Sequence, residues 1–185
     1  ARASALLLAR KATALSFEQA ATLPTTWVTA HVALERSRLR ASRRLLVHAA
    51  AGGVGLAAAG YARWVGACTL ATAGRPHKHA QLRAAGAGGL CSSRDGGAFA
   101  LGAARLLAGR RAHAALNSLS ADFIAASLAA LGERGCFEEI GKRGVWSAQR
   151  QAASAASLAY SAIALDLDLA SDPHWMHGML RLLSA

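Results

Sequence analysis

The stretch His48-Ala-Ala-Ala-Gly-Gly-Val-Gly55 decides the fold that we expect for this chain. It follows a short apolar run, Leu45-Leu-Val47, that is typical of a buried strand, and it opens into residues 54–65, which are typical of a helix. A glycine turn between a strand and a helix presents free backbone N–H groups, and the helix dipole favours negative charge there. The stretch therefore predicts an anion-binding turn, whose contact residues are Ala51, Gly52, Gly53, Val54 and Gly55.

The spacing of this turn is close to the dinucleotide fingerprint G-x-G-x-x-G, with Ala50, Gly52 and Gly55 at the three glycine positions. Gly52 would let a pyrophosphate approach the backbone, and Gly55 would let the helix pack closely on its strand. Two other interpretations stay open. The segment between Arg44 and Arg63 has no charged residue, as in a membrane span, although four glycines and a histidine interrupt it. An Ala/Gly-rich buried helix without a ligand is the second alternative.

The next predicted strand, residues 68–72, bears on the choice of cofactor. A site for NAD has Asp or Glu about 20 residues after the glycine motif, where the carboxylate bonds to the ribose 2′-hydroxyl. This chain has Thr72, Gly74, Arg75 and Lys78 there instead, and such groups suit a 2′-phosphate. The sequence therefore favours NADPH over NADH. The alternative is that Arg75 and Lys78 only begin an exposed helix.

Composition limits the class of protein. With 185 residues and 54% hydrophobic content, the chain can form one domain with a substantial core. The apolar run Leu6–Leu8 is too short for the core of a secretory signal. The cysteines are far apart and lie in predicted strands, so we expect buried thiols in a reducing, cytoplasmic compartment; they are Cys68, Cys91 and Cys136. The first residue is not Met, which fits a fragment as well as a processed chain.

The net charge of +11 raises nucleic acid as a partner. The densest basic cluster lacks the aromatic residues that stack on bases, and no nucleic-acid motif surrounds it; it comprises Arg36, Arg38, Arg40, Arg43 and Arg44. It falls where a helix should end and a strand begin, so we interpret it as a solvated turn and expect no nucleic-acid partner. A basic surface would also suit an acidic carrier protein or a phosphorylated cofactor arm.

Strand-like and helix-like segments alternate along the chain. The predicted strands are residues 44–49, 68–72, 89–93, 114–118, 136–141 and 160–166, and the predicted helices are about residues 25–37, 54–65, 76–86, 97–108, 120–131 and 173–184. This alternation predicts an α/β fold: a Rossmann-like, doubly wound, mainly parallel six-stranded sheet with helices on both faces. Ligands of such sheets bind at the carboxyl ends of the strands.

Local signals mark the helix ends. Predicted helix starts have capping residues or a proline at the first turn; they are Thr25-Thr26 behind Pro24, Ser120-Ala-Asp122, and Asp172-Pro173. Predicted helix stops are Gly86, Gly109 and Gly132. In the last helix, His174 and His177 have the spacing of two zinc ligands on one face. No further Cys or His is placed to complete four ligands, so we expect no metal.

Several ordered motifs resemble those of a known family. They are Leu15-Ser-Phe-Glu-Gln-Ala-Ala-Thr-Leu-Pro24, Thr29-Ala30 with Leu34, Leu46–Gly55, Ser92-Ser-Arg-Asp95, Leu116-Asn-Ser-Leu119, Glu139-Ile-Gly-Lys142, and Val145-Trp-Ser147 ahead of Ala164-Leu-Asp166. Through them the chain resembles the nucleotide-binding half of medium-chain dehydrogenase/reductases. The resemblance is strongest to enoyl reductase domains of polyketide and animal fatty acid synthases, with quinone oxidoreductases as close relatives.

The resemblance implies a role for each matching residue. Lys78, with Arg75, Ser93 and Arg94, would hold the 2′-phosphate end of NADPH. Near the pyrophosphate and nicotinamide we expect Thr29, Asn117, Ser118 and Gly141. Lys142 and Asp166 match the lysine and aspartate that such reductases are thought to use for proton donation or substrate orientation. The implied partners are a carrier-bound enoyl thioester and other synthase domains, and a homodimer within the synthase is compatible with this.

The chemistry of enoyl reduction makes Lys142 a reasonable candidate. Hydride addition to the β-carbon of a 2-enoyl thioester builds an enolate, which needs a cation nearby and then a proton at the α-carbon. Lys142 at a strand end would serve both needs, and Asp166, about one strand away, would tune its charge. Two alternatives stay open: Lys142 is an exposed turn residue beside Arg143, and Asp168 replaces Asp166 in this role.

Some features depart from the family pattern. Arg111-Ala-His113 stands where Gly-Val-Asp is usual, and Glu138 stands where an apolar residue is usual. A carboxylate in a doubly covered parallel strand is costly unless it is paired. The substrate-binding lobe that the family places before this region is absent from these 185 residues. A non-catalytic remnant of a synthase reductase and a free-standing quinone or alkenal reductase therefore remain alternatives to the enoyl reductase.

Overall fold

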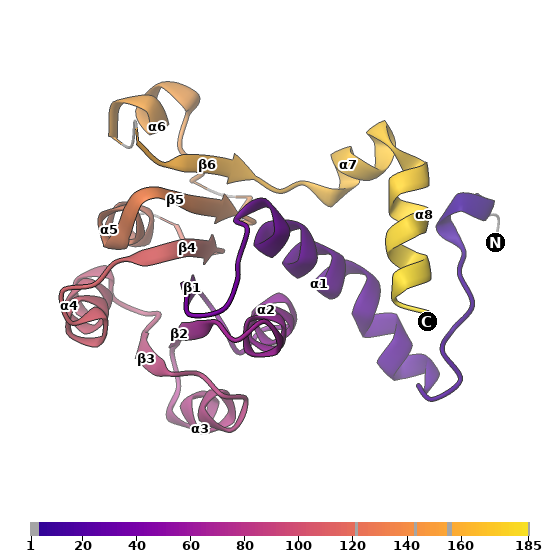
Figure 1. Ribbon diagram of the computed structural model, residues 1–185, viewed down its shortest axis with the longest axis horizontal. Coiled ribbons are helices and arrows are strands. Elements are labelled where there is room, and N and C mark those ends of the chain that lie inside the picture. The colour runs from indigo at the N-terminus through magenta and orange to yellow at the C-terminus, as the bar shows by residue number, and fades with distance from the viewer. Residues whose placement is uncertain (1–3, 121, 143, 155–156, 185) are drawn as a thin grey trace.

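Six parallel strands form the centre of the molecule (Figure 1). The computed structural model describes residues 4–120, 122–142, 144–154 and 157–184. The strands follow the order β3-β2-β1-β4-β5-β6, and every neighbouring pair is parallel. They are β1 (Arg44–Val47), β2 (Cys68–Ala73), β3 (Gly89–Ser92), β4 (Ala112–Asn117), β5 (Leu131–Glu139) and β6 (Ala159–Ala162). The order reverses direction between β1 and β4, and the predicted doubly wound fold is thereby confirmed.

Helices cover both faces of the sheet. Figure 1 shows α4 and α5 on one side of it and α1 and α2 on the other. The helical segments are η1 (Ala5–Leu7), α1 (Phe17–Arg36), α2 (Gly53–Trp64), α3 (Pro76–Ala84), α4 (Gly96–Leu107), α5 (Asp122–Ala130), α6 (Ala148–Ser154), α7 (Leu165–Ser171) and α8 (Pro173–Leu182). The short η1 packs against α8, which is distant in sequence, so the two ends of the described chain lie side by side.

The side-chain alternation of the strands divides the core into two layers. Leu45 and Val47 of β1 pack with α1 and α2, in a cluster that also contains Leu82 of α3. Leu46, between them, faces the opposite side and packs with Phe99 of α4 and residues of α5. Both faces of β1 are therefore buried, as expected for a central parallel strand.

The first long helix begins earlier than predicted. We placed its start at Thr25, behind Pro24, but α1 begins at Phe17 and contains Pro24. Ser16 and Gln19 form a capping box, in which each side chain accepts a hydrogen bond from the other's backbone N–H. The capping box is therefore the stronger start signal, and α1 continues through Pro24, which has no N–H to donate to the Ala20 carbonyl.

Other predicted helix ends have mixed outcomes. Asp172 caps α8 by accepting from the Trp175 N–H, with Pro173 at the first helical position, as predicted. Gly86 and Gly109 follow α3 and α4 with φ of 91° and 78°, so both predicted stops are confirmed. Gly132 is not a helix stop, because α5 ends at Ala130 and Gly132 already lies in β5. The predicted cap at Ser120–Asp122 includes residue 121, which lies outside the described residues.

The C-terminal part differs most from the prediction. The predicted strand 160–166 is shorter, because β6 ends at Ala162 and the chain turns into helix α7. Asp166 therefore lies on a helix and not at a strand end. A longer β6 would have no ladder partner, since its last pair is Ala162 with Glu139, the final residue of β5. The short helices α6 and α7 were not predicted.

The thiols and the apolar segment behind the glycine turn complete the description. Cys91 is buried and Cys136 is half-buried, but Cys68 is exposed at the start of β2, which corrects the expectation for that residue. Across the described ranges, no helix has both the length and the apolar character needed to cross a bilayer.

Candidate functional site

The glycine turn has the geometry of an anion site. Strand β1 ends at Val47, and helix α2 begins at Gly53 with Gly52 as its N-cap. No side chain caps this helix, and Gly52 and Gly53 are both exposed. The first N–H groups of a helix have no intrahelical acceptor, so they remain available to a ligand at this end.

The glycines of the turn serve two different purposes. A Cβ on Gly55 would lie 2.5 Å from the Ala50 Cα, so this glycine lets α2 pack directly against the turn, as the sequence predicts. Among the described residues, a Cβ on Gly52 would meet only the Ala49 carbonyl oxygen, at 3.3 Å. Packing therefore does not require a glycine at position 52. The missing side chain instead leaves the backbone exposed to solvent, and this is the surface that a phosphate would approach.

Residues predicted to hold a 2′-phosphate come from the ends of β2 and β3. A Cβ on Gly74 would lie 3.0 Å from the Arg94 Nε and 3.2 Å from the Ser93 Oγ, so these groups are adjacent. Arg75 is the exposed N-cap of α3, and Lys78 is half-buried in the first turn of the same helix. Three cations, Arg75, Lys78 and Arg94, thus follow the carboxyl ends of β2 and β3.

Thr72 does not belong to this set, which corrects the sequence-based expectation. Only 2% of its surface is exposed, and its hydroxyl faces the interior. The Thr72 Oγ1 accepts a hydrogen bond from the Ala49 N–H at 3.0 Å and lies 3.3 Å from the His48 Nδ1. Because both faces of a central parallel strand are covered, its residues show no polar-apolar alternation that would predict the direction of the Thr72 side chain.

A buried link joins the ends of β4 and β5. The Asn117 Nδ2 donates to the Glu139 Oε2 at 2.7 Å and to the Leu119 carbonyl at 2.6 Å. The Glu139 Oε1 accepts from the Gly141 N–H at 2.6 Å. Burial raises the pKa of Glu139, although the bonds from Asn117 and Gly141 oppose that rise. The Asn117 side chain thus shapes the loops that carry Ser118 and Lys142, and it is fully buried.

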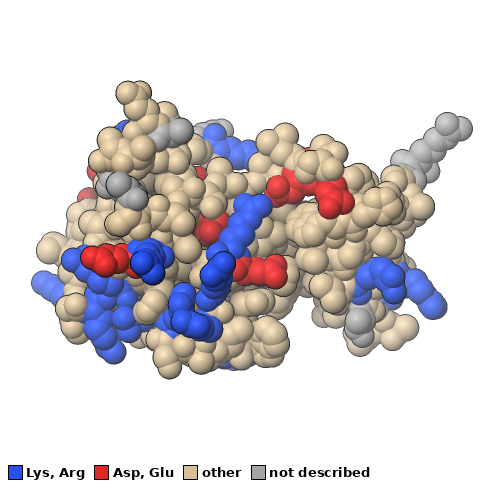
Figure 2. Space-filling view, turned by 45° about the horizontal axis from the view of Figure 1, so that its top comes forward, with Lys and Arg blue, Asp and Glu red and all other residues tan. Residues whose placement is uncertain are grey.

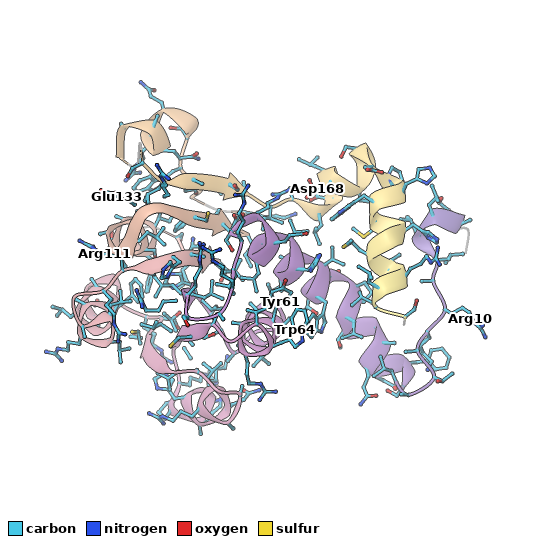
Figure 3. The ribbon with its side chains drawn as sticks, in the orientation of Figure 1. Arg10, Tyr61, Trp64, Arg111, Glu133 and Asp168 are labelled. Atoms are coloured by element: carbon cyan, nitrogen blue, oxygen red, sulfur yellow. The ribbon has the colours of Figure 1, made fainter. Side chains whose placement is uncertain are left out.

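Lys142 and Asp166 meet at the mouth of a cleft. The Lys142 Nζ lies 3.7 Å from the Asp166 Oδ2, and the two side chains are 78% and 68% exposed. Asp168, the sequence alternative (labelled in Figure 3), lies instead 3.7 Å from the Arg36 Nη2. The structure therefore brings Asp166, and not Asp168, to Lys142.

The cleft lies at the carboxyl ends of the strands and has a volume of about 680 Å³. It brings together four of the predicted site residues, which are Thr29, Val54, Lys142 and Asp166. Thr29 is mostly buried, and its hydroxyl donates to the Thr25 carbonyl within α1. The remaining wall is largely apolar and comes from segments whose role was not predicted; it includes Pro24, Ile163, Leu165, Leu169, Met176 and Leu180.

The arginine cluster lies away from this cleft. Arg38, Arg40 and Arg43 occupy the loop between α1 and β1, at the amino ends of the strands, so the predicted turn is confirmed. Burial, and then Arg44, Arg43 and Arg40, lower the pKa of His113 on β4. Figure 2 shows Lys and Arg side chains in several patches on one face, with groups of Asp and Glu beside some of them. Within the described residues, no group of three or more His, Cys, Asp or Glu could hold a metal ion.

Comparison with known proteins adds sequence and structural similarity to this geometry. Erythronolide synthase EryA2 of Saccharopolyspora erythraea is 45% identical over 139 residues, which are 74% of this chain and 4% of that synthase. The nucleotide-binding subdomain of the enoylreductase domain of PpsC from Mycobacterium tuberculosis is 33% identical, with a TM-score of 0.77. That alignment covers 85% of this chain and 89% of the subdomain. This chain belongs to the enoyl reductase domains of polyketide synthases.

Two further solved structures agree in fold. The CurK enoyl reductase is 35% identical with a TM-score of 0.89, over 96% of this chain and 53% of that one. Mycobacterial Rv1454c, solved as a complex with NADPH, is 27% identical with a TM-score of 0.82, over 96% of this chain and 56% of that one. The chain thus spans about half the length of these two proteins and corresponds to the nucleotide-binding half of the enoyl reductase family. No protein-family model matches it.

Proposed function

We propose that this chain forms the NADPH-binding half of an enoyl reductase, which reduces the 2-enoyl thioester double bond of a carrier-bound polyketide or fatty acyl chain. The observation that carries the proposal is the 3.7 Å contact of Lys142 with Asp166, in the same cleft as Val54 at the start of α2. A cation, a carboxylate and an anion-binding helix end thus share one cleft, at the sheet edge where α/β proteins bind ligands.

The residues of the site fit NADPH. The uncapped N-terminus of α2 and the exposed Gly52 suit a pyrophosphate. Ser93 and Arg94 lie against Gly74 at the ends of β2 and β3, and Arg75 and Lys78 begin α3 beside them. These donors suit a phosphate on the ribose and include no carboxylate for a 2′-hydroxyl. The NADPH complex of Rv1454c supports the same assignment by similarity.

Two residues of the cleft would stabilise the enolate and donate the proton in the reduction. When bound, NADPH supplies a hydride to the β-carbon of the substrate. The double-bond electrons then move toward the thioester oxygen, and the Lys142 ammonium stabilises the negative charge that develops there. Lys142 next gives a proton to the α-carbon, so that the C=C bond becomes a C–C bond with one added hydrogen at each carbon. Asp166, 3.7 Å from the Lys142 Nζ, would orient the ammonium toward the substrate.

The proposal includes a second lobe and further partners. Because the chain covers 53% of the CurK enoyl reductase, we infer that a substrate-binding lobe completes the cleft. The relatives are multidomain synthases, so the acyl substrate would arrive on a carrier protein and other synthase domains would be neighbours. Residues 1–185 alone should bind NADPH but reduce enoyl thioesters slowly, since catalysis needs a fixed substrate and exclusion of water.

Calorimetric titration of residues 1–185 with NADPH tests the proposal. We expect saturable binding, lost on Gly52→Val. Absence of binding by the folded chain would favour the second candidate, a non-catalytic remnant that only shapes the synthase. One observation favours that candidate: Glu138 is 2% exposed, and its Oε2 has no hydrogen-bond partner within the described residues. A buried polar atom without a partner is uncommon in native proteins, and it would suit a domain whose sequence has drifted.

A further inference from the structure

A buried histidine lies directly behind the glycine turn, and no step of the proposed reaction uses it. His48 follows β1, and only 3% of its surface is exposed. Its Nε2 lies 2.7 Å from the Ser127 Oγ of α5, and its Nδ1 lies 3.3 Å from the Thr72 Oγ1 of β2. The rings of Phe99 and Phe123 meet it edge-on, with centroids 4.8 and 5.7 Å away. The imidazole therefore joins three elements of the fold.

The hydrogen bonds around His48 have only one consistent direction. The Ser127 hydroxyl donates its single proton to the Phe123 carbonyl at 2.6 Å, so it accepts from the His48 Nε2–H. The Thr72 Oγ1 accepts from the Ala49 N–H at 3.0 Å, which leaves its own proton for the His48 Nδ1. Each donor then has an acceptor when the imidazole is neutral and its proton is on Nε2.

The charge state agrees with this arrangement. Burial lowers the pKa of His48 to about 4. The groups that face it from β2, α4 and α5 are the Thr72 and Ser127 hydroxyls and the Phe99 and Phe123 rings, none of which is charged. The imidazole is therefore neutral at the pH of a cell, and its lone pair on Nδ1 remains an acceptor.

The chain of hydrogen bonds ends on a strained residue of the turn. Ala49 has φ of 47°, in the left-handed region that alanine rarely adopts. Thr72 fixes this residue and the next: its hydroxyl accepts from the Ala49 N–H, and its carbonyl accepts from the Ala50 N–H at 2.9 Å. The Ala49 carbonyl in turn accepts from the Gly52 N–H at 2.9 Å. A strained residue persists only where its surroundings determine it, and here Thr72 does so.

We propose that His48 is a positioning residue for the cofactor: its neutral imidazole orients the Thr72 hydroxyl, which holds Ala49 left-handed and thereby sets the shape of the phosphate-binding turn. The ligand of that turn is NADPH only if the proposed function holds. The positioning role itself concerns the protein alone. In this role, Thr72 supports the turn from the interior of the protein and does not contact the 2′-phosphate.

The first test reads the tautomer. In the ¹⁵N-labelled chain, we expect the His48 ring to show a protonated Nε2 and a pyridine-like Nδ1, unchanged between pH 8 and pH 5. Comparison with His48→Gln identifies its signals among those of the seven histidines. A protonated Nδ1, or a titration near the ordinary histidine pKa, would overturn the proposal.

The second test separates positioning from stability. Thr72→Val keeps the shape and removes the hydroxyl, whereas Thr72→Ser keeps the hydroxyl. The matched control is Ile124→Val, which changes a fully buried residue of the apolar cluster that contains Phe99 and Phe123. We expect Thr72→Val to speed hydrogen exchange of the Ala49 amide and to weaken NADPH binding, each by about tenfold. Thr72→Ser and Ile124→Val should leave both within about twofold.

The outcomes distinguish this inference from the proposed function. Equal Ala49 exchange in Thr72→Val and wild type would refute the positioning role, whatever the cofactor result. Equal weakening of NADPH binding by Ile124→Val and Thr72→Val would refute it as well, because stability alone would then explain the loss. If the wild-type chain binds no NADPH, the proposed function fails, and the tautomer and the Ala49 exchange still decide the role of His48.

Discussion

The Lys142 ammonium lies 3.7 Å from the Asp166 carboxylate, across the gap between the end of β5 and the start of α7. Both side chains are mostly exposed, and exposed ion pairs of this kind contribute at most about 1 kcal/mol to stability. The pair therefore contributes little to the stability of the fold. Its position in a cleft with the glycine-turn residue Val54 fits a role in chemistry instead.

Replacement of Lys142 should affect turnover more than cofactor binding. In a reductase that contains both lobes, we expect Lys142→Ala to lower the turnover of a crotonyl thioester by about 100-fold or more, as for loss of a general acid. NADPH affinity should change little, because the partner of Lys142 in the proposed mechanism is the developing enolate. Steady-state kinetics and a cofactor titration provide the measurement. Asp168→Asn is the matched control, and its turnover should stay close to that of wild type. If Asp168→Asn turned over as slowly as Lys142→Ala, the assignment of Asp166 as the partner of Lys142 would be contradicted.

The two kinds of glycine in the turn predict opposite phenotypes. Gly52→Val should abolish NADPH binding while the free energy of unfolding changes by about 1 kcal/mol or less, because only the Ala49 oxygen lies within 4 Å of the added carbon. Gly55→Ala should instead destabilise the fold by about 1–3 kcal/mol, since its methyl group would meet the Ala50 Cα at 2.5 Å. Denaturant unfolding and calorimetry on both variants provide the test. A Gly52→Val protein that is as destabilised as Gly55→Ala would mean that both glycines serve packing.

Cofactor selectivity should depend on the cations at the ends of β2 and β3. We expect wild type to bind NADPH more tightly than NADH, and Arg94→Ala to weaken NADPH by about tenfold, the magnitude of one lost charge-assisted hydrogen bond. NADH affinity should be unaffected, because it has no 2′-phosphate. Lys78→Ala should act in the same direction, and Arg83→Ala, at the far end of α3, is the control. Equal affinity of wild type for the two cofactors would contradict this assignment.

The sequence predicted the sheet well because its signal is local. Strands β1 to β4 were placed within two residues at each end, since apolar runs, glycine turns and helical segments follow one another without ambiguity. Segment 165–168, Leu-Asp-Leu-Asp, failed because its alternation has the period of a strand. It forms α7 instead, because β5 ends at Glu139 and offers no further backbone partner. That fact depends on the length of a neighbouring strand, which local periodicity does not contain.

The site was predicted in part for the same reason. The glycine turn, Lys142 and the cations near Gly74 follow from motifs and spacing, whether read directly or through the family resemblance. The buried link from Asn117 through Glu139 to Gly141 depends on the register between β4 and β5, which pairs Asn117 with Glu139. The inward direction of Thr72 depends on covering both faces of β2. Both features can be recognised only in the tertiary structure. They support the glycine turn and the loop that carries Lys142, which the sequence identifies.

Glu138 should make the stability of this chain depend on pH near neutrality. Burial raises the pKa of its carboxyl to about 7, with Arg36 opposing the rise, from an ordinary value of 4.5. Between these two values the folded state therefore holds more protons than the unfolded state. The stabilisation from the protonated carboxyl is complete below pH 4.5 and is lost as pH rises through 7. Its full size is on the order of 3 kcal/mol, because one pKa unit corresponds to about 1.4 kcal/mol.

The expected outcome is that removal of this carboxyl stabilises the protein at high pH. At pH 8, Glu138→Leu should raise the free energy of unfolding by about 2–3 kcal/mol, because a buried charge without a partner is replaced by an apolar side chain. Glu138→Gln should abolish this part of the pH dependence, which separates loss of charge from gain of packing. The control is Glu133→Gln, on the same strand but exposed (Figure 3). Urea unfolding between pH 5 and pH 8 measures the effect, and an unchanged pH profile in Glu138→Gln would show that Glu138 is ionised and solvated in the folded chain.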